Sequence, residues 1–383
     1  MADMSEQIAQ IRKMVDEGAY FTINRARQYG KTTVLTALEK VLKTDYLVIS
    51  LDFQDLGNAS FQDETTFSLS FLELFLQEME RCHAGDMPGM GAIMEEAEKS
   101  LESGGKIWTL MFLFRFLHRI CEQSTRPVVL MIDEVDSASN NQVFLDFLSQ
   151  LRSYYLKRDT KRMITFHSVI LAGVYDIRNL KRKIRPDESH KTNSPWNIAA
   201  DFSVDMSLSK NGIERMLGEY EDDHHTGMDI GEMAGLLSDY TSGYPYLVSR
   251  LCKLLDEIIG GTNEENKKDA WTKTDFLKAV RMLLMESNTL FESLIGKLID
   301  YPELGKMLKE LLFFGKPITY NPTNPVISLA MMFGFVKNQD GKVIPANRIF
   351  DTLLYNHFLS MDELESSEMY LASLMDQIIE AVV

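Results

Sequence analysis

The sequence predicts an α/β fold: a parallel, doubly wound sheet, then a helical region and a small C-terminal domain. Over residues 1–207 short apolar runs alternate with helix-forming segments, which is the pattern of strands joined by crossover helices. Two of those runs end in residues that are typical of ligand-binding strand ends. From about Leu208 the pattern becomes helical, and a hairpin follows near residue 340.

The elements of the expected sheet domain follow one another in a regular order. The first is an amphipathic helix over 6–18, which leads into the first apolar strand, and further strands and helices follow along the chain. The expected strands lie at Tyr20–Ile23, Tyr46–Phe53, Pro127–Glu134 and Ile164–Val174. The expected helices lie at 6–18, 31–43, 66–82, 106–121 and 142–156, with a loop at 83–91.

A glycine–lysine–threonine sequence follows the first strand. Gly30 lets the backbone approach a phosphate closely, and the helix that starts there directs its amides and positive dipole end at the anion. Lys31 would reach the β- and γ-phosphates, and the Thr32 hydroxyl would bind Mg²⁺. The usual pattern has a glycine where this chain has Arg25. The predicted nucleotide-binding residues of this segment, called the 25–33 loop below, are Arg25, Ala26, Arg27, Gln28, Tyr29, Gly30, Lys31, Thr32 and Thr33.

A second signal lies in the run Pro127–Ile132, which is apolar throughout and ends in two carboxylates. Such a run is typical of a strand buried on both faces of a parallel sheet, whose carboxyl end faces the ligand crevice. Asp133 is predicted to hold the Mg²⁺ shell, and Glu134 to activate the attacking water as a general base. Asp136 is expected to cap a helix or to lie behind the metal ligand. Together the two signals predict binding of ATP and Mg²⁺.

Composition narrows the classes of protein further. The chain has 383 residues, of which 45% are hydrophobic, and a net charge of −16. No window approaches 18 uninterrupted apolar residues and no signal region begins the chain, so we expect a cytoplasmic protein without membrane contact. The charge argues against a nonspecific polyanion binder but leaves a local nucleic-acid surface open. Cys82, Cys121 and Cys252 fit no metal spacing and are expected to be reduced, buried thiols.

The C-terminal half is expected to be mostly helical. Helices are predicted at 210–220, 229–240, 244–259, 273–287, 291–299, 303–314 and 325–333, with a polar loop at 260–266. Residues 335–345 read as a hairpin that turns at Asp340–Gly341. Helix, helix, helix, hairpin is the order of a winged helix. Residues 361–383 carry six acidic and no basic residues and are expected to form an amphipathic helix.

At this point four segments resemble one known family. The segment Ile23–Thr33 is similar to the phosphate loop of bacterial AAA-like P-loop ATPases close to the archaeal-type and STAND ATPases, where arginine often begins the turn. Leu171–Leu180 looks like the sensor-1 strand of that family, and Ser194–Ala199 resembles its Ser-Pro-Phe-Asn-Ile-Ala segment. Thr241–Leu247 resembles the turn that opens a lid helix and packs a proline, here Pro245, near the adenine.

The resemblance covers roughly residues 8–360 and implies a domain organisation. It implies a P-loop NTPase domain over 1–207, a helical lid over 208–290, a winged-helix-like domain over 291–360 and the tail helix. Arg178, after the sensor strand, is the candidate sensor or arginine finger. A surface role for it stays open, because a basic cluster follows that could contact a nucleic acid or an acidic partner.

The function that follows is an Mg²⁺-dependent ATP-binding and ATP-hydrolysing switch that couples nucleotide state to a protein partner or effector, and the resemblance implies slow hydrolysis. An oligomer is compatible with it. One alternative is a nucleotide-gated scaffold without turnover. Another is a DNA-binding regulator that uses the winged helix, but residues 291–360 carry seven Lys/Arg against six Asp/Glu, a poor electrostatic footprint for DNA.

Overall fold

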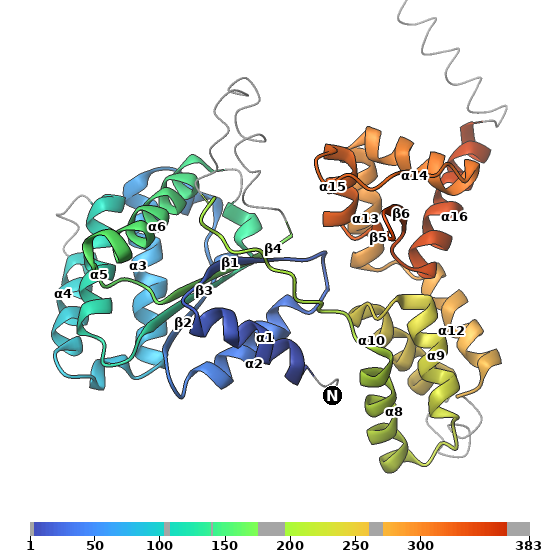
Figure 1. The fold of residues 1–383 in the computed structure, drawn as a ribbon, viewed down its shortest axis with the longest axis horizontal. Helices are drawn as coiled ribbons and strands as arrows, with labels where there is room; N and C mark the ends of the chain where they lie inside the picture. Colours follow the sequence, from blue (N-terminus) through green and yellow to red (C-terminus); the bar gives the residue numbers. More distant parts are fainter. Residues whose placement is uncertain (1–3, 103–107, 139–140, 175–195, 260–270, 366–383) are drawn as a thin grey trace, which may run out of the picture. The chain divides into compact units, whose positions relative to one another are not determined.

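The computed structural model describes residues 4–102, 108–138, 141–174, 196–259 and 271–365. By its internal contacts the chain divides into two compact units (Figure 1). We call residues 4–26 and 30–206 the sheet unit, and residues 27–29 with those from 207 onward the helical unit. The tip of the 25–33 loop therefore groups with the C-terminal half of the chain.

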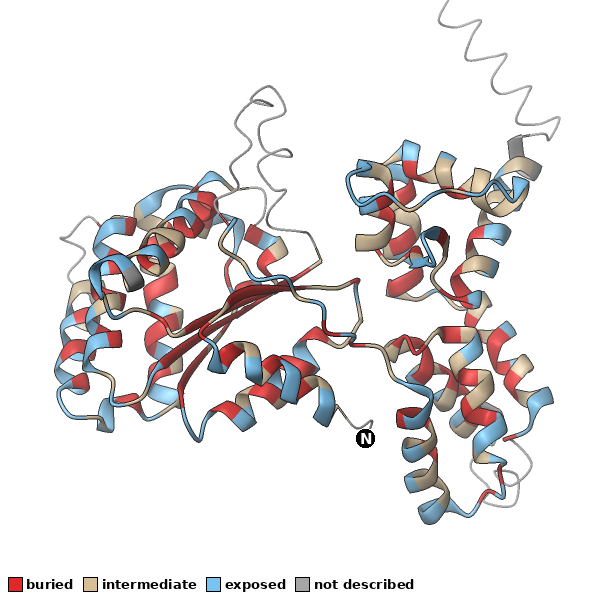
Figure 2. Ribbon diagram, viewed as in Figure 1, coloured by how far each residue is buried: buried red, intermediate tan, exposed pale blue. Residues whose placement is uncertain are grey.

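The sheet unit contains a four-stranded parallel sheet in the order β1-β4-β3-β2, which confirms the predicted α/β class. Every residue of β3 and β4 is buried (Figure 2), as expected for strands covered on both faces. Asn24 pairs with Gly173, and Asp52 with Asp133, so the polar strand ends share one edge. The strands are β1 Tyr20–Asn24, β2 Leu47–Asp52, β3 Val128–Asp133 and β4 Ser168–Gly173.

Helices cover both faces of this sheet. Figure 1 shows α1 and α2 on one face and α3, α5 and α6 on the other, the doubly wound arrangement. The helices are α1 Ser5–Asp16, α2 Lys31–Leu42, α3 Glu64–Arg81, α4 Met90–Glu102, α5 Leu110–Gln123 and α6 Gln142–Lys161. Short 3₁₀ turns are η1 Phe53–Asp55, η2 Asn58–Phe61, η3 Ala84–Asp86 and η4 Val135–Ala138.

Two sequence expectations in this unit need correction. Helix α4 was not predicted, because the glycines of residues 83–91 suggested a loop and the sequence after them was assigned no element. The fourth strand begins at Ser168 rather than Ile164. Ile164 is 54% exposed, so its apolar side chain does not belong to the buried strand.

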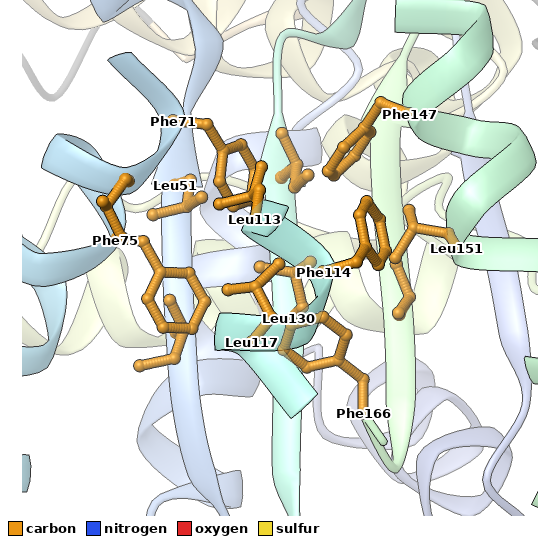
Figure 3. Packing of buried hydrophobic residues seen from close by; sticks show 14 of the residues in the cluster. Leu51, Phe71, Phe75, Leu113, Phe114, Leu117, Leu130, Phe147, Leu151 and Phe166 are labelled. Atoms are coloured by element: carbon orange, nitrogen blue, oxygen red, sulfur yellow. The ribbon is translucent and has the colours of Figure 1, made fainter. Parts of the chain in front are cut away.

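Aromatic side chains fill the space between the sheet and the α3–α5–α6 layer (Figure 3). The Phe147 ring on α6 lies 5.0 Å from that of Phe71 on α3 and 5.4 Å from that of Phe114 on α5. Leu130 of β3 packs beneath them. Burying one such side chain contributes about 1.5–3 kcal/mol. This core fixes β3, and with it the position of Asp133 at the strand end.

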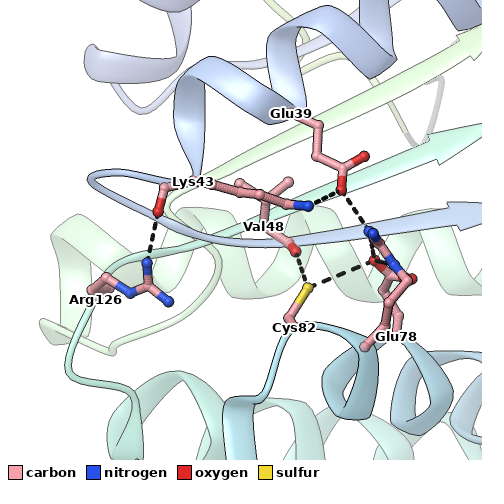
Figure 4. Close-up of polar contacts among 7 residues, drawn as sticks. Glu39, Lys43, Val48, Glu78, Cys82 and Arg126 are labelled. Carbon is pink, nitrogen blue, oxygen red and sulfur yellow. Dashed lines mark hydrogen bonds and ion pairs between the residues drawn. The ribbon is translucent and has the colours of Figure 1, made fainter.

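The carboxyl end of α2 is tied to its neighbours by polar contacts (Figure 4). The Glu39 carboxylate accepts from Lys43 at 2.7 Å and from Arg81 at the end of α3 at 2.5 Å. Burial opposes ionisation of Glu39, but these two hydrogen bonds outweigh it and lower the pKa of the carboxyl. The Cys82 thiol donates to the Val48 carbonyl at 3.3 Å. The end of helix α2 is thereby held to α3, and the end of α3 to β2.

Trp196 anchors the segment that runs beside β1. Its indole N–H donates to the Thr22 hydroxyl at 2.9 Å, and its ring stacks on Tyr20 with 6.1 Å between centroids. The side chain is fully buried, as a packing anchor requires. Ala200 forms a parallel bridge with Phe21 at the free edge of the sheet. Residues 194 and 195 of the family-like segment lie outside the described residues.

In its described residues, the helical unit contains the seven predicted helices and one more near its C-terminal end. They are α8 Lys210–His224, α9 Ile230–Thr241, α10 Pro245–Lys253, α12 Lys273–Met285, α13 Thr289–Asp300, α14 Pro302–Phe314, α15 Pro325–Met332 and α16 Arg348–Glu365. The predicted helix over 244–259 changes at Leu254 into a π-helical segment, η7, that runs to Ile259. The predicted loop at 260–266 lies outside the described residues.

The predicted hairpin is present as β5 Val336–Gln339 and β6 Lys342–Pro345, which pair antiparallel. Its turn places Asp340 at φ 51° and Gly341 at φ 79°, both left-handed, as a tight two-residue hairpin turn requires. The order of α13, α14, α15 and hairpin agrees with the sequence expectation, and the winged-helix assignment itself stays a prediction. Helix α16 was not predicted, and it runs through the expected boundary between residues 360 and 361.

Candidate nucleotide-binding site

The 25–33 loop joins β1 to α2 and has alternating backbone geometry. Gln28 has φ 56° and Gly30 has φ 80°, both left-handed, while φ is negative at the residues between and beside them. A Cβ at Gly30 would meet no atom within 4 Å, so glycine is needed there for its φ and not for space. Such alternation turns successive amides into a concavity that suits an anion, at the positive end of the α2 dipole.

Lys31 folds back across this concavity. Its side chain is only 6% exposed, and the ammonium donates to the carbonyls of Arg25 at 3.3 Å and Ala26 at 3.4 Å. A buried cation needs such partners because desolvation disfavours its charge. The ammonium is thereby held over the loop, where the sequence analysis expected it to meet phosphate oxygens.

Thr32 and Asp133 meet directly although they lie 101 residues apart. The Thr32 hydroxyl donates to Asp133 Oδ2 at 2.6 Å, and Oδ1 of the same carboxylate accepts the Glu134 amide at 2.9 Å. A hydroxyl and a carboxylate are hard oxygen donors, the kind that Mg²⁺ takes from a protein when phosphates supply further oxygens. The two residues predicted to hold Mg²⁺ are therefore adjacent and fit that ion chemically.

Glu134 follows β3 and turns sharply, with φ 50°. A left-handed glutamate costs about 1–2 kcal/mol, and such strain is often found at functional sites. Burial raises the pKa of its carboxyl, the nearby Lys31 charge lowers it, and Asp133, Asp136 and Asp52 raise it again, with a net upward shift. A raised pKa brings a carboxylate nearer the range that suits a general base.

Asp136 has a structural contact. Its Oδ2 accepts the Val174 amide at 2.6 Å, which ties η4 to the end of β4. A Cβ at Gly173 would lie 2.9 Å from Asp136 Oδ1, so the approach depends on glycine. Asp136 lies inside η4 and not at its N-cap, so the capping expectation is wrong. It supports the turn that carries Glu134, in line with the other expectation.

The two arginines of the loop behave differently. Arg25 donates to the carbonyls of Asn24 at 2.8 Å and Val204 at 2.5 Å, and its guanidinium stacks over Phe202. It therefore joins the loop to the segment that ends the sheet unit. Arg27 is exposed, and its carbonyl accepts a hydrogen bond from Tyr244. Arg178 lies outside the described residues, so its predicted role stays a prediction.

The turn at the start of α10 requires its glycine. Gly243 has φ 72°, and a Cβ there would lie 2.2 Å from the Leu208 carbonyl oxygen. The Gly243 carbonyl in turn accepts the Leu208 amide at 2.8 Å. Pro245 occupies the first position of α10, where its fixed φ suits a helix start. The Gly-x-Pro turn thus has the expected form, and its contact with adenine stays a prediction.

Tyr244 was missed by the sequence analysis, which took only Pro245 from this turn. The side chain is 3% exposed, and its ring lies edge-on to that of Tyr29 at 4.6 Å. Burial raises the pKa of its phenol, so the hydroxyl stays protonated and can donate to the Arg27 carbonyl. In a sequence, an aromatic residue in a turn predicts only that its side chain is buried. No sequence pattern predicts that its hydroxyl will donate to a distant carbonyl, here that of Arg27.

With this geometry in place, comparison with known proteins decides the family. A family model described as "AAA-like domain" matches residues 3–359. The chain belongs to the AAA-like domain family. The sequence resemblance to AAA-like P-loop ATPases is thereby confirmed.

Individual relatives of this AAA-like chain are distant. An uncharacterised WD repeat-containing protein of Synechocystis is 22% identical over 371 residues, which are 93% of this chain and 29% of that protein. Among solved structures, the Walker-type ATPase paby2304 of Pyrococcus abyssi is 13% identical, covers 93% of this chain and 96% of its own, and gives a TM-score of 0.58. The RuvB Holliday junction branch migration motor of Thermotoga maritima is 12% identical, covers 91% of this chain and 94% of its own, and gives a TM-score of 0.41. The Pyrococcus structure shows that the AAA-like chain shares the P-loop ATPase fold.

Three further observations concern the AAA-like chain as described. In the part of the chain that the structure describes, no helix is both long and apolar enough to cross a membrane. No group of three or more His, Cys, Asp or Glu side chains suited to a metal ion occurs among the described residues. Cys82, Cys121 and Cys252 are free thiols, with Cys121 buried and the other two partly buried.

Proposed function

We propose that this chain is an Mg²⁺-dependent ATPase that works as a switch and passes its nucleotide state to a protein partner or effector. One observation carries the proposal: the 2.6 Å contact between the Thr32 hydroxyl and the Asp133 carboxylate, next to a lysine held over an open loop. Family membership and the P-loop ATPase fold support it.

Each residue of the site has a role in this proposal. The amides of the 25–33 loop bind the phosphates, and Lys31 neutralises the β- and γ-phosphate oxygens. Thr32 gives its hydroxyl, and Asp133 its carboxylate, to the Mg²⁺ shell. The bound ion supplies positive charge that stabilises the transferred phosphoryl group. The separation of Thr32 and Asp133 fits a shared ion, because their oxygens already meet directly.

Glu134 acts as the general base of the proposed reaction. It orients a water molecule toward the γ-phosphorus and accepts its proton as the bond to the leaving ADP oxygen breaks. Its raised pKa and the turn that carries it support this role. Arg178 is proposed to stabilise the charge of the transition state, and Pro245 to contact the adenine.

Turnover separates this proposal from its closest alternative, a scaffold that binds ATP without hydrolysing it. Glu134 favours hydrolysis, since a pure scaffold needs no base. An oligomer in a cytoplasmic setting agrees with the proposal, because the arginine that completes such a site can come from a neighbouring copy. DNA binding through residues 291–360 is the weaker alternative, because that segment carries almost as many acidic as basic residues.

The experiment that tests the proposal is ATP binding by Lys31→Ala, measured by titration calorimetry with Mg²⁺. Loss of a charged hydrogen-bond donor is worth about 1.5–3 kcal/mol, so the Kd should rise by roughly tenfold to more than a hundredfold. Lys40→Ala is the matched control, since Lys40 is an exposed lysine on the same helix. Equal Kd values for a folded Lys31→Ala variant and the wild type would exclude the proposed site.

A further inference from the structure

Tyr244 contacts residues 27–29, the part of the 25–33 loop that belongs to the helical unit. Its hydroxyl donates to the Arg27 carbonyl, and its ring meets Tyr29 edge-on at 4.6 Å. The same ring also meets Phe350 of α16 edge-on, with 5.3 Å between the ring centroids. Residues 27–29 and Tyr244 belong to the same compact unit, although the remainder of the 25–33 loop belongs to the sheet unit. One buried tyrosine therefore contacts both the loop and a C-terminal helix.

The contact sets the direction of one loop amide. The Arg27 carbonyl and the Gln28 N–H belong to one planar trans peptide, so they point in opposite directions. A hydrogen bond on the carbonyl from Tyr244 therefore turns the Gln28 N–H away from the tyrosine. Within the described part of the chain, that N–H has no hydrogen-bond partner. It is available to an anion in the loop.

The same contact supports a strained residue. Gln28 is left-handed, which costs free energy for a residue with a Cβ and persists only where the surroundings hold it. Two hydroxyls hold this turn: Tyr244 on the carbonyl before it, and Thr289, which accepts the Gln28 side-chain amide at 3.0 Å. Tyr244 is buried and Thr289 is exposed, so the tyrosine bond is the better shielded of the two.

We propose that Tyr244 is a positioning residue for the nucleotide phosphates. Its hydroxyl keeps the 25–33 loop in the anion-receptive conformation, and its ring links that conformation to Phe350 in α16. This inference rests on the proposed function, because it names a residue that prepares the same site. It assigns Tyr244 no contact with the reacting atoms.

Removal of the Tyr244 hydroxyl should change the affinity for ATP and the rate of hydrolysis differently. When only part of the molecules hold the receptive loop, the apparent Kd rises by the inverse of that fraction. In the proposed reaction the rate of the bound complex depends on Glu134, and Tyr244 takes no part in the chemical step. Loss of the hydroxyl should therefore weaken binding and leave kcat nearly unchanged.

The test is Tyr244→Phe, which removes the hydroxyl and keeps the ring contacts. The Kd for Mg²⁺-ATP should rise about fivefold, which corresponds to about 1 kcal/mol for one hydrogen bond. The value of kcat should stay within about twofold. Hydrogen exchange of residues 25–30 without nucleotide should become faster. Tyr246→Phe is the matched control. Tyr246 lies two residues further on, in α10, and its hydroxyl forms no hydrogen bond with any described residue.

Unchanged ATP affinity and unchanged exchange in a folded Tyr244→Phe variant would overturn the inference. So would a fall in kcat with no change in Kd. Thr289→Val tests the second hydroxyl and should raise the Kd by no more than about twofold, since exposed contacts contribute little. If Tyr244→Phe does not fold, Phe350→Leu replaces it, because it removes the ring contact with Tyr244: exchange of residues 25–30 should become faster, and unaltered loop exchange in that folded variant would overturn the inference. Absence of ATP binding by the wild type would refute the proposed function instead.

Discussion

At the scale of single residues, the environment of Glu134 differs from that of an ordinary surface carboxylate. Its backbone is left-handed, its carboxyl is half-buried, and its pKa is raised by burial and by neighbouring aspartates against the influence of Lys31. Asp52 at the end of β2 also has a pKa raised first by burial. Two carboxylates of the same sheet edge thus compete for the role of base, and substitution can separate them.

Glu134→Gln should retain ATP binding and lose hydrolysis. Glutamine keeps the shape but cannot accept the proton of the attacking water, so kcat should fall by about two to four orders of magnitude. Steady-state phosphate release with Mg²⁺-ATP measures this. Asp52→Asn is the control, since its Oδ1 can still cap η1 by accepting the Gln54 amide, and its rate should stay within about tenfold.

Near-normal turnover in Glu134→Gln would assign the base elsewhere. A loss that appeared only in Asp52→Asn would transfer the role to β2.

The sequence was informative about residues whose chemistry follows from a strand end. Thr32 and Asp133 were predicted to share one ion, and they touch because the loop after β1 and the end of β3 lie at the same carboxyl edge of the parallel sheet. It was less informative where one side chain meets a distant backbone. Asp136 was expected to cap a helix or to lie behind the metal ligand, but its partner, the Val174 amide, was not predicted, and Tyr244 was not singled out at all. Such partners depend on tertiary geometry and leave no periodic signal.

At the scale of elements, hydrophobic periodicity identified most strands and helices, including the hairpin at Asp340–Gly341. Periodicity gave the wrong bounds where the local composition was unusual for the element. The glycines of residues 83–91 concealed the start of α4, and exposed Ile164 extended a strand too far. Helix α16 crosses a boundary that composition alone suggested, because a change from mixed to acidic charge does not end a helix.

Gly243→Ala should destabilise the helical unit strongly. The residue is left-handed, and the new methyl group would lie 2.2 Å from the Leu208 carbonyl oxygen. Backbone strain of about 1–2 kcal/mol adds to an overpacking cost of about 1–3 kcal/mol. Chemical denaturation of the full chain, followed by circular dichroism, measures the free energy of unfolding.

Gly315→Ala is the matched control for this substitution. Gly315 ends α14 with φ 56°, and a Cβ there would meet no atom within 4 Å. Gly315→Ala should lower the free energy of unfolding only by the cost of the left-handed backbone, about 1–2 kcal/mol. Equal losses for the two variants would mean that the turn before α10 has room to move, and that Leu208 does not restrict it.

At the scale of the whole molecule, the chain divides into two units at the 25–33 loop as well as at residue 207. The tip of the loop groups with the helical unit, while Lys31 and Thr32 group with the sheet unit. Within the helical unit, Lys337 of the hairpin donates to the Ser242 hydroxyl at 2.9 Å, beside the turn that starts α10. A ligand that binds one arrangement of this loop better than another shifts the equilibrium between them only by its differential affinity.

The central claim is that nucleotide in the loop is sensed beyond it, and hydrogen exchange of Glu134→Gln with and without Mg²⁺-ATP tests this most directly. This variant should hold ATP long enough to measure, and Lys31→Ala provides the control without binding. We predict added protection in residues 20–40, in 241–259 and in part of 291–360. Protection confined to 20–40 would contradict the switch and leave an ATPase module with an independent C-terminal half.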